Sequence, residues 1–161
     1  MTPRAPAPVR KGLITIRPAR LQDAEAMSAI RIASITALCA PDHDNDADTI
    51  ADWIANKAGA AFRSMLARDA ILLVAERDGR VVGLGGARGA RVTLNYVDPD
   101  CRFAGVSTAL LAALEAAIAA QGFASANLDS TATALRFYAE RGWRQTGPGS
   151  RLAGYPMVKL L

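Results

Sequence analysis

The residues best suited to chemistry lie in one stretch, NYVDPDCRFAGV at residues 95–106, which runs into a long alanine- and leucine-rich segment. Pro99 ends a predicted strand, because proline cannot donate a hydrogen bond to a sheet. A helix that opens at Gly105 presents backbone amides without partners in the helix, at the positive end of its dipole. Such an end can bind a phosphate, and glycine lets the ligand approach closely. Arg102 adds a guanidinium that matches phosphate geometry.

A second candidate is the acidic segment PDHDNDAD at residues 41–48, in which Asp44 and Asp46 are spaced as at the start of a calcium loop. The sixth position of that loop would be Thr49 instead of glycine, and the twelfth would be Ala55 instead of glutamate. Because the pattern fails twice, we expect no metal site and a solvated loop that caps the following helix.

The two cysteines, Cys39 and Cys101, have neither the spacing of a zinc site nor the number of a disulfide framework. We expect free thiols in a reducing compartment. Because Cys101 lies beside the expected anion loop, a reactive thiol is an alternative to an ordinary loop residue.

The composition favours one globular domain, since 51% of the 161 residues are hydrophobic. We expect a disordered tail at residues 1–12 and a domain at 13–161. The tail carries Arg4, Arg10 and Lys11, so the rest has 16 basic and 15 acidic residues, which argues against a nucleic-acid-binding face. No apolar run reaches about 18 residues, and the N-terminus lacks the apolar core of a signal peptide. We therefore expect a cytoplasmic protein without a membrane segment.

The order of the predicted elements indicates a mixed sheet with helices on its faces. Three strands joined by tight turns form an antiparallel meander, and a strand-helix-strand crossover then makes the next pair parallel. In chain order we expect a strand at 13–16, a helix from Asp23 to about 38, a helix from about 48 that Gly59 interrupts and that resumes at 60–67, strands at 71–76, 81–87 and 91–97, a helix at 105–121, a strand at 124–128, a helix at about 131–141, and closing strands at 143–146 and 156–160.

The helix at 105–121 has a clear apolar stripe, and Gly122 is expected to end it. The residues of the stripe follow at steps of three and four, which places them on one face toward the core; they are Val106, Leu110, Leu111, Leu114 and Ile118.

Two motifs in register make the chain resemble the GNAT superfamily of N-acetyltransferases. The segment VDPDCRFAGVS, from Val97 to Ser107, is similar to the acyl-CoA loop of that family, V-x-P-x-x-R/Q-x-x-G-x-G/A. The segment ALRFYAERGW, from Ala134 to Trp143, is similar to its second signature, A-x-x-F/L-Y-x-x-x-G-F/W. Ser107 stands where glycine or alanine is usual, and Thr131 stands where many members have asparagine.

The resemblance extends from residue 13 to the C-terminus and implies a bacterial-type acetyltransferase domain. The implied fold is α/β, with a mixed, mostly antiparallel sheet of about seven strands, about four flanking helices, and a splay between strands four and five. A dinucleotide-binding domain is disfavoured, because the turn lacks G-x-G-x-x-G.

The implied activity is transfer of an acetyl group from acetyl-CoA to a primary amine by direct attack, without an acyl-enzyme. Tyr138 would be the general acid for the departing thiolate, since a phenol with a pKa of about 10 keeps its proton at neutral pH. On periodicity alone Tyr138 would be a core aromatic, and the alternative function is a non-catalytic acyl-CoA-binding or regulatory module. The candidates for a general base besides water are His43, Glu76, Asp98 and Asp129.

The resemblance also implies the binding residues. Main-chain groups near Tyr96 and Val97 would hold the pantetheine arm, and the amides of residues 103–107 would hold the pyrophosphate. The implied cofactor-binding set is Tyr96, Val97, Arg102, Phe103, Ala104, Gly105, Val106, Ser107 and Thr131.

The acceptor is expected to be a small-molecule or peptide amine. Asp44 and Asp46 would border its pocket and attract the cation, and Trp53 would line it. The resemblance leaves a homodimer open and implies neither a nucleic-acid partner nor a membrane partner.

Overall fold

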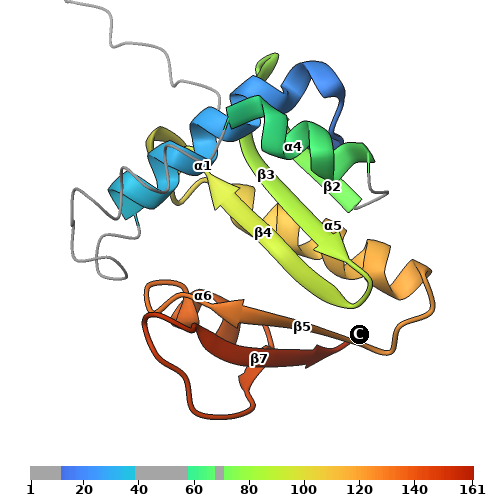
Figure 1. The fold of residues 1–161 in the computed structure, drawn as a ribbon, viewed down its shortest axis with the longest axis vertical. Helices are drawn as coiled ribbons and strands as arrows, with labels where there is room; N and C mark the ends of the chain where they lie inside the picture. Colours follow the sequence, from blue (N-terminus) through green and yellow to red (C-terminus); the bar gives the residue numbers. More distant parts are fainter. Residues whose placement is uncertain (1–11, 39–57, 68–70) are drawn as a thin grey trace, which may run out of the picture.

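One mixed sheet forms the centre of the computed structural model, which describes residues 12–38, 58–67 and 71–161 (Figure 1). The seven described strands lie in the order β1-β2-β3-β4-β5-β7-β6, and only β4 and β5 run parallel among neighbours. This confirms the predicted fold class. The strands are β1 Thr15–Pro18, β2 Ile71–Arg77, β3 Arg80–Arg88, β4 Arg91–Val97, β5 Ser125–Ser130, β6 Arg144–Gln145 and β7 Tyr155–Leu160.

The helices cover both faces of the sheet. Figure 1 shows α1 and α4 over one face and α5 behind the other. Within the described residues the α-helices are α1 Ala24–Leu38, α4 Ala58–Ala67, α5 Val106–Ala120 and α6 Leu135–Ala139. None of these helices is long and apolar enough to cross a membrane.

The two faces have separate cores. On the α1 face, Met27 and Ile30 pack with Leu72, Val74 and Leu84 of β2 and β3. On the α5 face, the predicted apolar stripe of that helix is buried as expected. Burial of one such aliphatic side chain contributes about 1.5–3 kcal/mol, so this stripe fixes α5 against the sheet.

Close packing of α5 on β3 depends on the glycine at position 83. A Cβ built there would lie 2.6 Å from Cγ1 of Val106 and 3.0 Å from Cδ1 of Leu110. The absence of a side chain therefore allows the first turn of α5 to lie close to the sheet.

Two N-terminal expectations are wrong in detail. The strand predicted at residues 13–16 lies at Thr15–Pro18, so its proline is inside the strand. A proline is tolerated there because β1 is an edge strand. Gly59 does not interrupt a helix, because α4 runs through it from Ala58. A glycine costs a helix only about 1 kcal/mol relative to alanine, which packing can outweigh.

The elements around residue 131 also differ from the prediction. β5 extends to Ser130, which pairs with Tyr155, and α6 is the short helix Leu135–Ala139 instead of 131–141. The cause is a turn in which the backbone N–H of Ala134 donates to the carbonyl and to Oγ1 of Thr131, both at 3.2 Å. The closing strand predicted at 143–146 is reduced to the two residues of β6.

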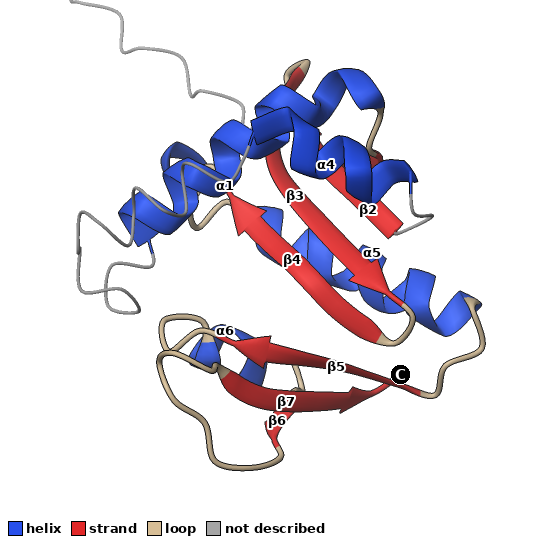
Figure 2. Cartoon of the chain, in the orientation of Figure 1, coloured by secondary structure: helices blue, strands red, loops and turns tan. Residues whose placement is uncertain are grey.

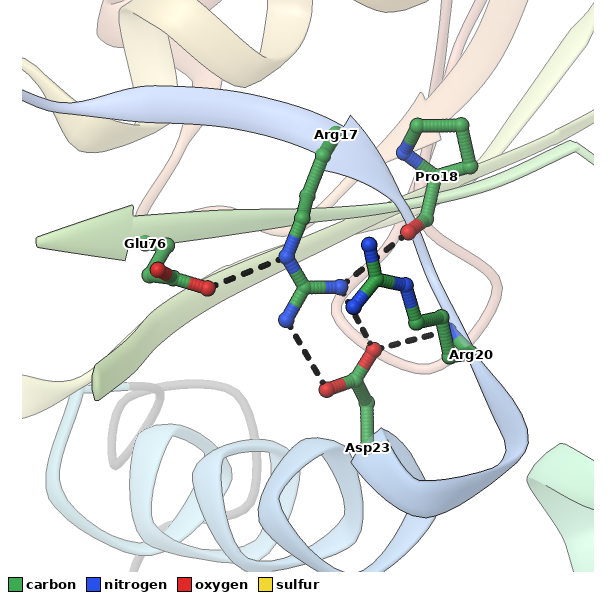
Figure 3. Close-up of polar contacts among 5 residues, drawn as sticks. All are labelled: Arg17, Pro18, Arg20, Asp23 and Glu76. Carbon is green, nitrogen blue, oxygen red and sulfur yellow. Dashed lines mark hydrogen bonds and ion pairs between the residues drawn. The ribbon is translucent and has the colours of Figure 1, made fainter. Parts of the chain in front are cut away.

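A network of ion pairs and hydrogen bonds joins β1 to the start of α1 (Figure 3). Asp23 is the last residue of a 3-10 turn, not the helix N-cap that was predicted, and its carboxylate accepts from the backbone N–H of Arg20 at 2.7 Å. The Arg17 guanidinium donates to both oxygens of Asp23, at 2.8 and 3.0 Å, and to Glu76 of β2 at 3.0 Å. Asp23 is 7% exposed, so little solvent competes for these bonds.

Asp23→Asn is expected to lower the free energy of unfolding by about 1–3 kcal/mol at neutral pH, because a charged hydrogen bond to Arg17 is lost. The Arg17 guanidinium holds the pKa of the Asp23 carboxyl below its usual range. The contribution is therefore present above the unfolded pKa of about 4 and is lost as the pH falls through the folded value. Urea unfolding of the wild type and of Asp23→Asn at about pH 7 and about pH 3 measures this contribution.

Glu140→Gln is the matched control for that prediction, because the pair between Arg136 and Glu140 is exposed. We expect it to cost less than about 1 kcal/mol at either pH. An Asp23→Asn effect as small as the control, or equally large at both pH values, would contradict the anchoring role.

Candidate active site

β4 and β5 separate after a single contact point. Their register pairs Arg91 with Asn127, whose backbone N–H donates to the carbonyl of Ala90 at 2.9 Å. Beyond this point the strands diverge, as Figure 2 shows, and a cavity of about 210 Å³ lies between residues 92–97 of β4 and residues 128–131. The predicted splay is confirmed, and it leaves room for a ligand along β4.

The turn between β4 and α5 directs backbone amides outward. Asp98 accepts from the backbone N–H of Asp100 at 3.0 Å and so forms the 3-10 turn Pro99–Cys101. Gly105 is the N-cap of α5, with a φ of +83°, and a Cβ built on it would meet no atom within 4 Å. This conformation favours glycine, and the free space beside it leaves the first amides of the helix accessible.

A second cavity, of about 390 Å³, lies against this helix end. Val97 and Arg102 line both cavities, so the two adjoin. Phe103 lines the second cavity, is 90% exposed, and lies under the Arg102 guanidinium at 4.7 Å from its ring centroid. The two cavities together provide a continuous site that reaches from β4 and β5 to a helix end suited to an anion.

Arg141 joins α6 to the first turn of α5 on the wall of the second cavity. Its guanidinium donates to Oγ1 of Thr108 at 2.8 Å and to the carbonyl of Phe137 at 2.8 Å, and it stacks 3.8 Å from the Phe137 ring centroid. These contacts fix α6 relative to the helix end, and they add a second cation beside Arg102.

Tyr138 of α6 lines the cavity between β4 and β5 and is only 7% exposed. Its ring meets Phe137 and Trp143 edge-on, at centroid distances of 5.1 and 5.8 Å. Burial raises the pKa of Tyr138 to about 12, although a side-chain hydrogen bond with Asn95 acts in the opposite direction. The phenol therefore keeps its proton at neutral pH, as expected of a proton donor.

Several polar residues of this cavity were not predicted from the sequence, among them Ser34 and Asn95. Ser34 comes from α1 and is 3% exposed. Asn95 lies in β4, and its Oδ1 is buried without a hydrogen-bond partner in the described structure. The sequence could have marked Asn95 as a candidate functional residue, because asparagine is depleted in strands and Asn95 lies in a predicted strand.

The candidate general bases that are described all have cationic partners. Glu76 pairs with Arg17, Asp98 with Arg80 at 2.7 Å, and Asp129 with Arg91. Of the three carboxylates, that of Asp129 belongs to a residue lining the cavity between β4 and β5.

The structure brings most of the predicted cofactor residues together. Tyr96, Val97, Arg102 and Thr131 line the first cavity with Tyr138. The second cavity is lined by Val97, Arg102, Phe103, Gly105, Val106 and Ser107. Ala104 lines neither cavity and packs against the core cluster that contains Val106.

Several predicted residues lie outside the described structure. These include the acidic segment with Asp44 and Asp46, the segment with Trp53, and the candidate base His43. Cys39 lies outside it as well, whereas Cys101 is buried and its sulfur accepts from Arg77 at 3.3 Å. The described residues contain no cluster of His, Cys, Asp and Glu that would hold a metal ion.

Known proteins share this fold and these elements. A family model described as an acetyltransferase (GNAT) domain matches residues 39–160. The structure of a GCN5-related N-acetyltransferase from Rhodopseudomonas palustris is 29% identical, with a TM-score of 0.82 over 96% of this chain and 100% of its own. A comparison with curated proteins gave no match.

Two more distant structures agree in fold. The PaiA N-acetyltransferase of Thermoplasma acidophilum, solved in complex with coenzyme A, is 18% identical, with a TM-score of 0.78 over 92% of this chain and 99% of its own. The ribosomal-protein-S18-alanine N-acetyltransferase of Escherichia coli is 16% identical, with a TM-score of 0.64 over 92% and 94% of the two chains.

The chain belongs to the GNAT acetyltransferase family, because the family match covers most of its length. It is an N-acetyltransferase of the class that uses acetyl-CoA. That residues 13–161 form a single domain stays a prediction.

Proposed function

We propose that this protein transfers an acetyl group from acetyl-CoA to a primary amine by direct attack, with Tyr138 as the general acid. The observation that carries the proposal is the buried phenol of Tyr138 in the cavity between β4 and β5. The support from known proteins is the family match and the coenzyme A bound in the PaiA structure of the same fold.

The described residues fit acetyl-CoA in shape and charge. The pantetheine arm suits the cavity along residues 92–97, where the β5-facing main chain of β4 has space. The pyrophosphate suits the helix end at Gly105, where amides, the helix dipole and Arg102 all favour an anion. The buried, unpartnered Oδ1 of Asn95 marks a place for a donor in the same cavity.

The residues of the chain then have distinct roles in the reaction. Bound acetyl-CoA supplies a thioester, whose carbonyl carbon is open to attack by a neutral amine. Tyr138 holds a proton at Oη, and we assign it the transfer of that proton to the sulfur as the C–S bond breaks. The attacking nitrogen gives up one proton to water as the C–N bond forms, and the phenolate regains a proton from solvent before the next turnover. Burial of Tyr138 keeps the phenol neutral until that step and excludes water from it. Positioning of the two substrates in one cleft supplies much of the remaining acceleration.

The acceptor is proposed to be a small-molecule or peptide amine. The Escherichia coli enzyme of the same fold is named for an alanine of ribosomal protein S18, which is a protein amine. The roles of Asp44, Asp46 and Trp53 at the acceptor pocket, and the presence of a homodimer, stay predictions.

The test is the release of CoA thiol from acetyl-CoA in the presence of an alkylamine, an amino acid, an aminoglycoside and a peptide with a free N-terminus. We expect at least one amine to raise thiol release above the rate without acceptor and to gain an acetyl group by mass spectrometry. Binding of acetyl-CoA without amine acetylation in any of these mixtures would favour a non-catalytic acyl-CoA-binding module instead.

A further inference from the structure

We propose that the side chain of Phe103 is the surface on which the adenine ring of acetyl-CoA stacks. The inference deepens the proposed function and rests on it, because it takes acetyl-CoA to lie along the two adjoining cavities. Phe103 stands at a position that the loop motif V-x-P-x-x-R/Q-x-x-G-x-G/A leaves open to any residue. The role is therefore a property of this chain and concerns the ring of Phe103, in addition to its backbone amide.

The Phe103 side chain contributes little to the packing of the fold. Phe103 is 90% exposed and belongs to none of the hydrophobic clusters of the described structure. A phenylalanine stabilises a fold mainly through the large apolar area that it buries, and this one leaves most of that area in solvent. Single exposed hydrophobic residues are common on protein surfaces, so the exposure is informative only together with the backbone conformation.

The backbone conformation of Phe103 is unfavourable for a phenylalanine. Its φ is +58°, in the left-handed region that is readily adopted by glycine and, among other residues, by asparagine and aspartate. The other described non-glycine residue with a positive φ is Asp78, an aspartate in the tight turn between β2 and β3, where this conformation is usual. Strained residues of this kind cluster at ligand sites. A phenylalanine that is both strained and exposed is explained by a contact with a ligand.

The ring lies on the wall that the adenosine of acetyl-CoA would follow. Phe103 lines the cavity of about 390 Å³ together with Gly105 and the first turn of α5. The pyrophosphate is assigned to the amides of that turn, and in acetyl-CoA the pyrophosphate joins the pantetheine arm to the adenosine. Because the arm is assigned to the cavity between β4 and β5, the adenosine extends from the pyrophosphate in the other direction, along the second cavity.

Phe103 is the more accessible of the two aromatic residues that line this cavity in the described part of the chain. The other is Phe137, which packs against the core, lies under the Arg141 guanidinium at 3.8 Å and meets Tyr138 edge-on. The Arg102 guanidinium lies over the Phe103 ring at 4.7 Å from its centroid, yet most of that residue stays exposed. A base can stack on such a ring, because every base has a π-face.

The experiment compares two ligands by NMR titration, which also measures weak binding. They are acetyl-CoA and S-acetyl-phosphopantetheine, which ends at its phosphate and lacks the adenosine. Phe103→Leu keeps an apolar side chain of similar size but removes the ring. It is expected to raise the Kd for acetyl-CoA by about 5- to 100-fold, the usual range for the loss of one base–aromatic stack. The Kd for S-acetyl-phosphopantetheine is expected to stay within about twofold of the wild type.

The second ligand tests the main alternative role of Phe103, which is to hold Arg102 in place for a phosphate. In that case Phe103→Leu would weaken both ligands by a similar factor, and this result would overturn the inference. An unchanged Kd for acetyl-CoA in Phe103→Leu would overturn it as well. Phe103→Tyr keeps an aromatic ring and is expected to retain the Kd for acetyl-CoA within about twofold.

Phe123→Leu is the matched control, because Phe123 is also exposed, at 41%, and lines neither cavity of the site. We expect it to keep the Kd for acetyl-CoA within about twofold of the wild type. A Phe123→Leu protein that loses as much affinity as Phe103→Leu would show a general effect of removing a surface ring and would contradict the specific role of Phe103.

A structural readout identifies the stacked ring directly. In the wild-type complex we expect nuclear Overhauser contacts between the ring protons of Phe103 and the adenine protons of acetyl-CoA. The adenine protons should also shift upfield on binding, and this ring-current shift should be lost in Phe103→Leu. Adenine contacts to Phe137 in place of Phe103, or no contact to either ring, would overturn the assignment.

Phe103→Asn separates binding from stability. Asparagine tolerates the left-handed conformation, so the ligand-free variant is expected to keep or raise the thermal midpoint of the wild type. Its Kd for acetyl-CoA is expected to rise as in Phe103→Leu, because the ring is absent. A lower midpoint together with the wild-type Kd would make Phe103 a structural residue and overturn the inference.

The outcomes distinguish this inference from the proposed function. A wild-type protein that does not bind acetyl-CoA saturably would contradict the proposed function itself. Loss of binding in Gly105→Glu together with the wild-type Kd in Phe103→Leu would keep acetyl-CoA at the helix end and would overturn the stacking role of Phe103 alone.

Discussion

Replacing Tyr138 with phenylalanine is expected to lower kcat for acetyl transfer by about 10²–10⁴-fold, the usual contribution of a positioned general acid. The substitution removes only the hydroxyl, so the edge-on packing of the ring on Phe137 and Trp143 is kept. The thiolate would then depart without a proton donor. The KM for acetyl-CoA should change little, because the assigned anion site lies at the helix end near Gly105.

The same role predicts a pH dependence. Burial raises the pKa of Tyr138 to about 12, so the phenol remains protonated throughout the range in which amines become neutral. The rate should therefore rise with pH as the amine loses its proton. Up to about pH 10 it should not decline through loss of the Tyr138 proton. Steady-state rates from about pH 6 to 10 measure this.

Tyr155→Phe is the control for the kinetic prediction, because Tyr155 lies in β7 and lines neither described cavity. We expect it to keep kcat within about threefold of the wild type. If the Tyr138→Phe enzyme had the wild-type kcat, Tyr138 would be only a core aromatic residue, and its proposed role as the general acid would be contradicted.

Gly105→Glu is expected to abolish stabilisation of the protein by acetyl-CoA. In the wild type, acetyl-CoA at about 100 times its Kd should add about 2.7 kcal/mol to the free energy of unfolding. For a chain of this size the thermal midpoint should rise on the order of 5–10 °C. The glutamate side chain would occupy the free space beside the first amides of α5, and its charge would repel the pyrophosphate.

The matched control is Gly79→Glu in the turn between β2 and β3. Gly79 has a φ of +75°, close to the +83° of Gly105, and a Cβ on it also meets no atom within 4 Å. The backbone cost of glutamate is therefore similar, but the position lines neither cavity of the site. We expect Gly79→Glu to keep the acetyl-CoA shift. Equal shifts in both variants and the wild type would place the nucleotide elsewhere.

Local pattern was sufficient for much of the fold. The meander of β2, β3 and β4 follows from short strands with tight turns, and the buried stripe of α5 follows from its apolar spacing. The limits of α6 were not predictable in this way. A side-chain turn at Thr131 takes the place of the first helical turn, and pairing with β7 extends β5 to Ser130. The pairing with β7 is a contact with a distant segment, and the turn at Thr131 begins where that paired strand ends.

The candidate site also has one part that could be predicted from the sequence and one part that could not. The start of α5 at Gly105 was predictable because the residues that form this helix end are contiguous in the sequence, and its role in anion binding stays a prediction. The place of Asn95 and Tyr138 on the wall of one cavity was not, because the two positions lie 43 residues apart in the sequence. Neither residue indicates the other until the fold is known.

The most direct test of the account is chemical-shift mapping of backbone amides by NMR as acetyl-CoA is titrated into the wild-type protein. The account predicts saturable changes that are largest at residues 103–107 and that continue along residues 92–97 and 128–131, which line the two adjoining cavities. Changes confined to the β6–β7 edge, or no saturable change at all, would contradict the assignment of the acetyl-CoA site to this part of the fold.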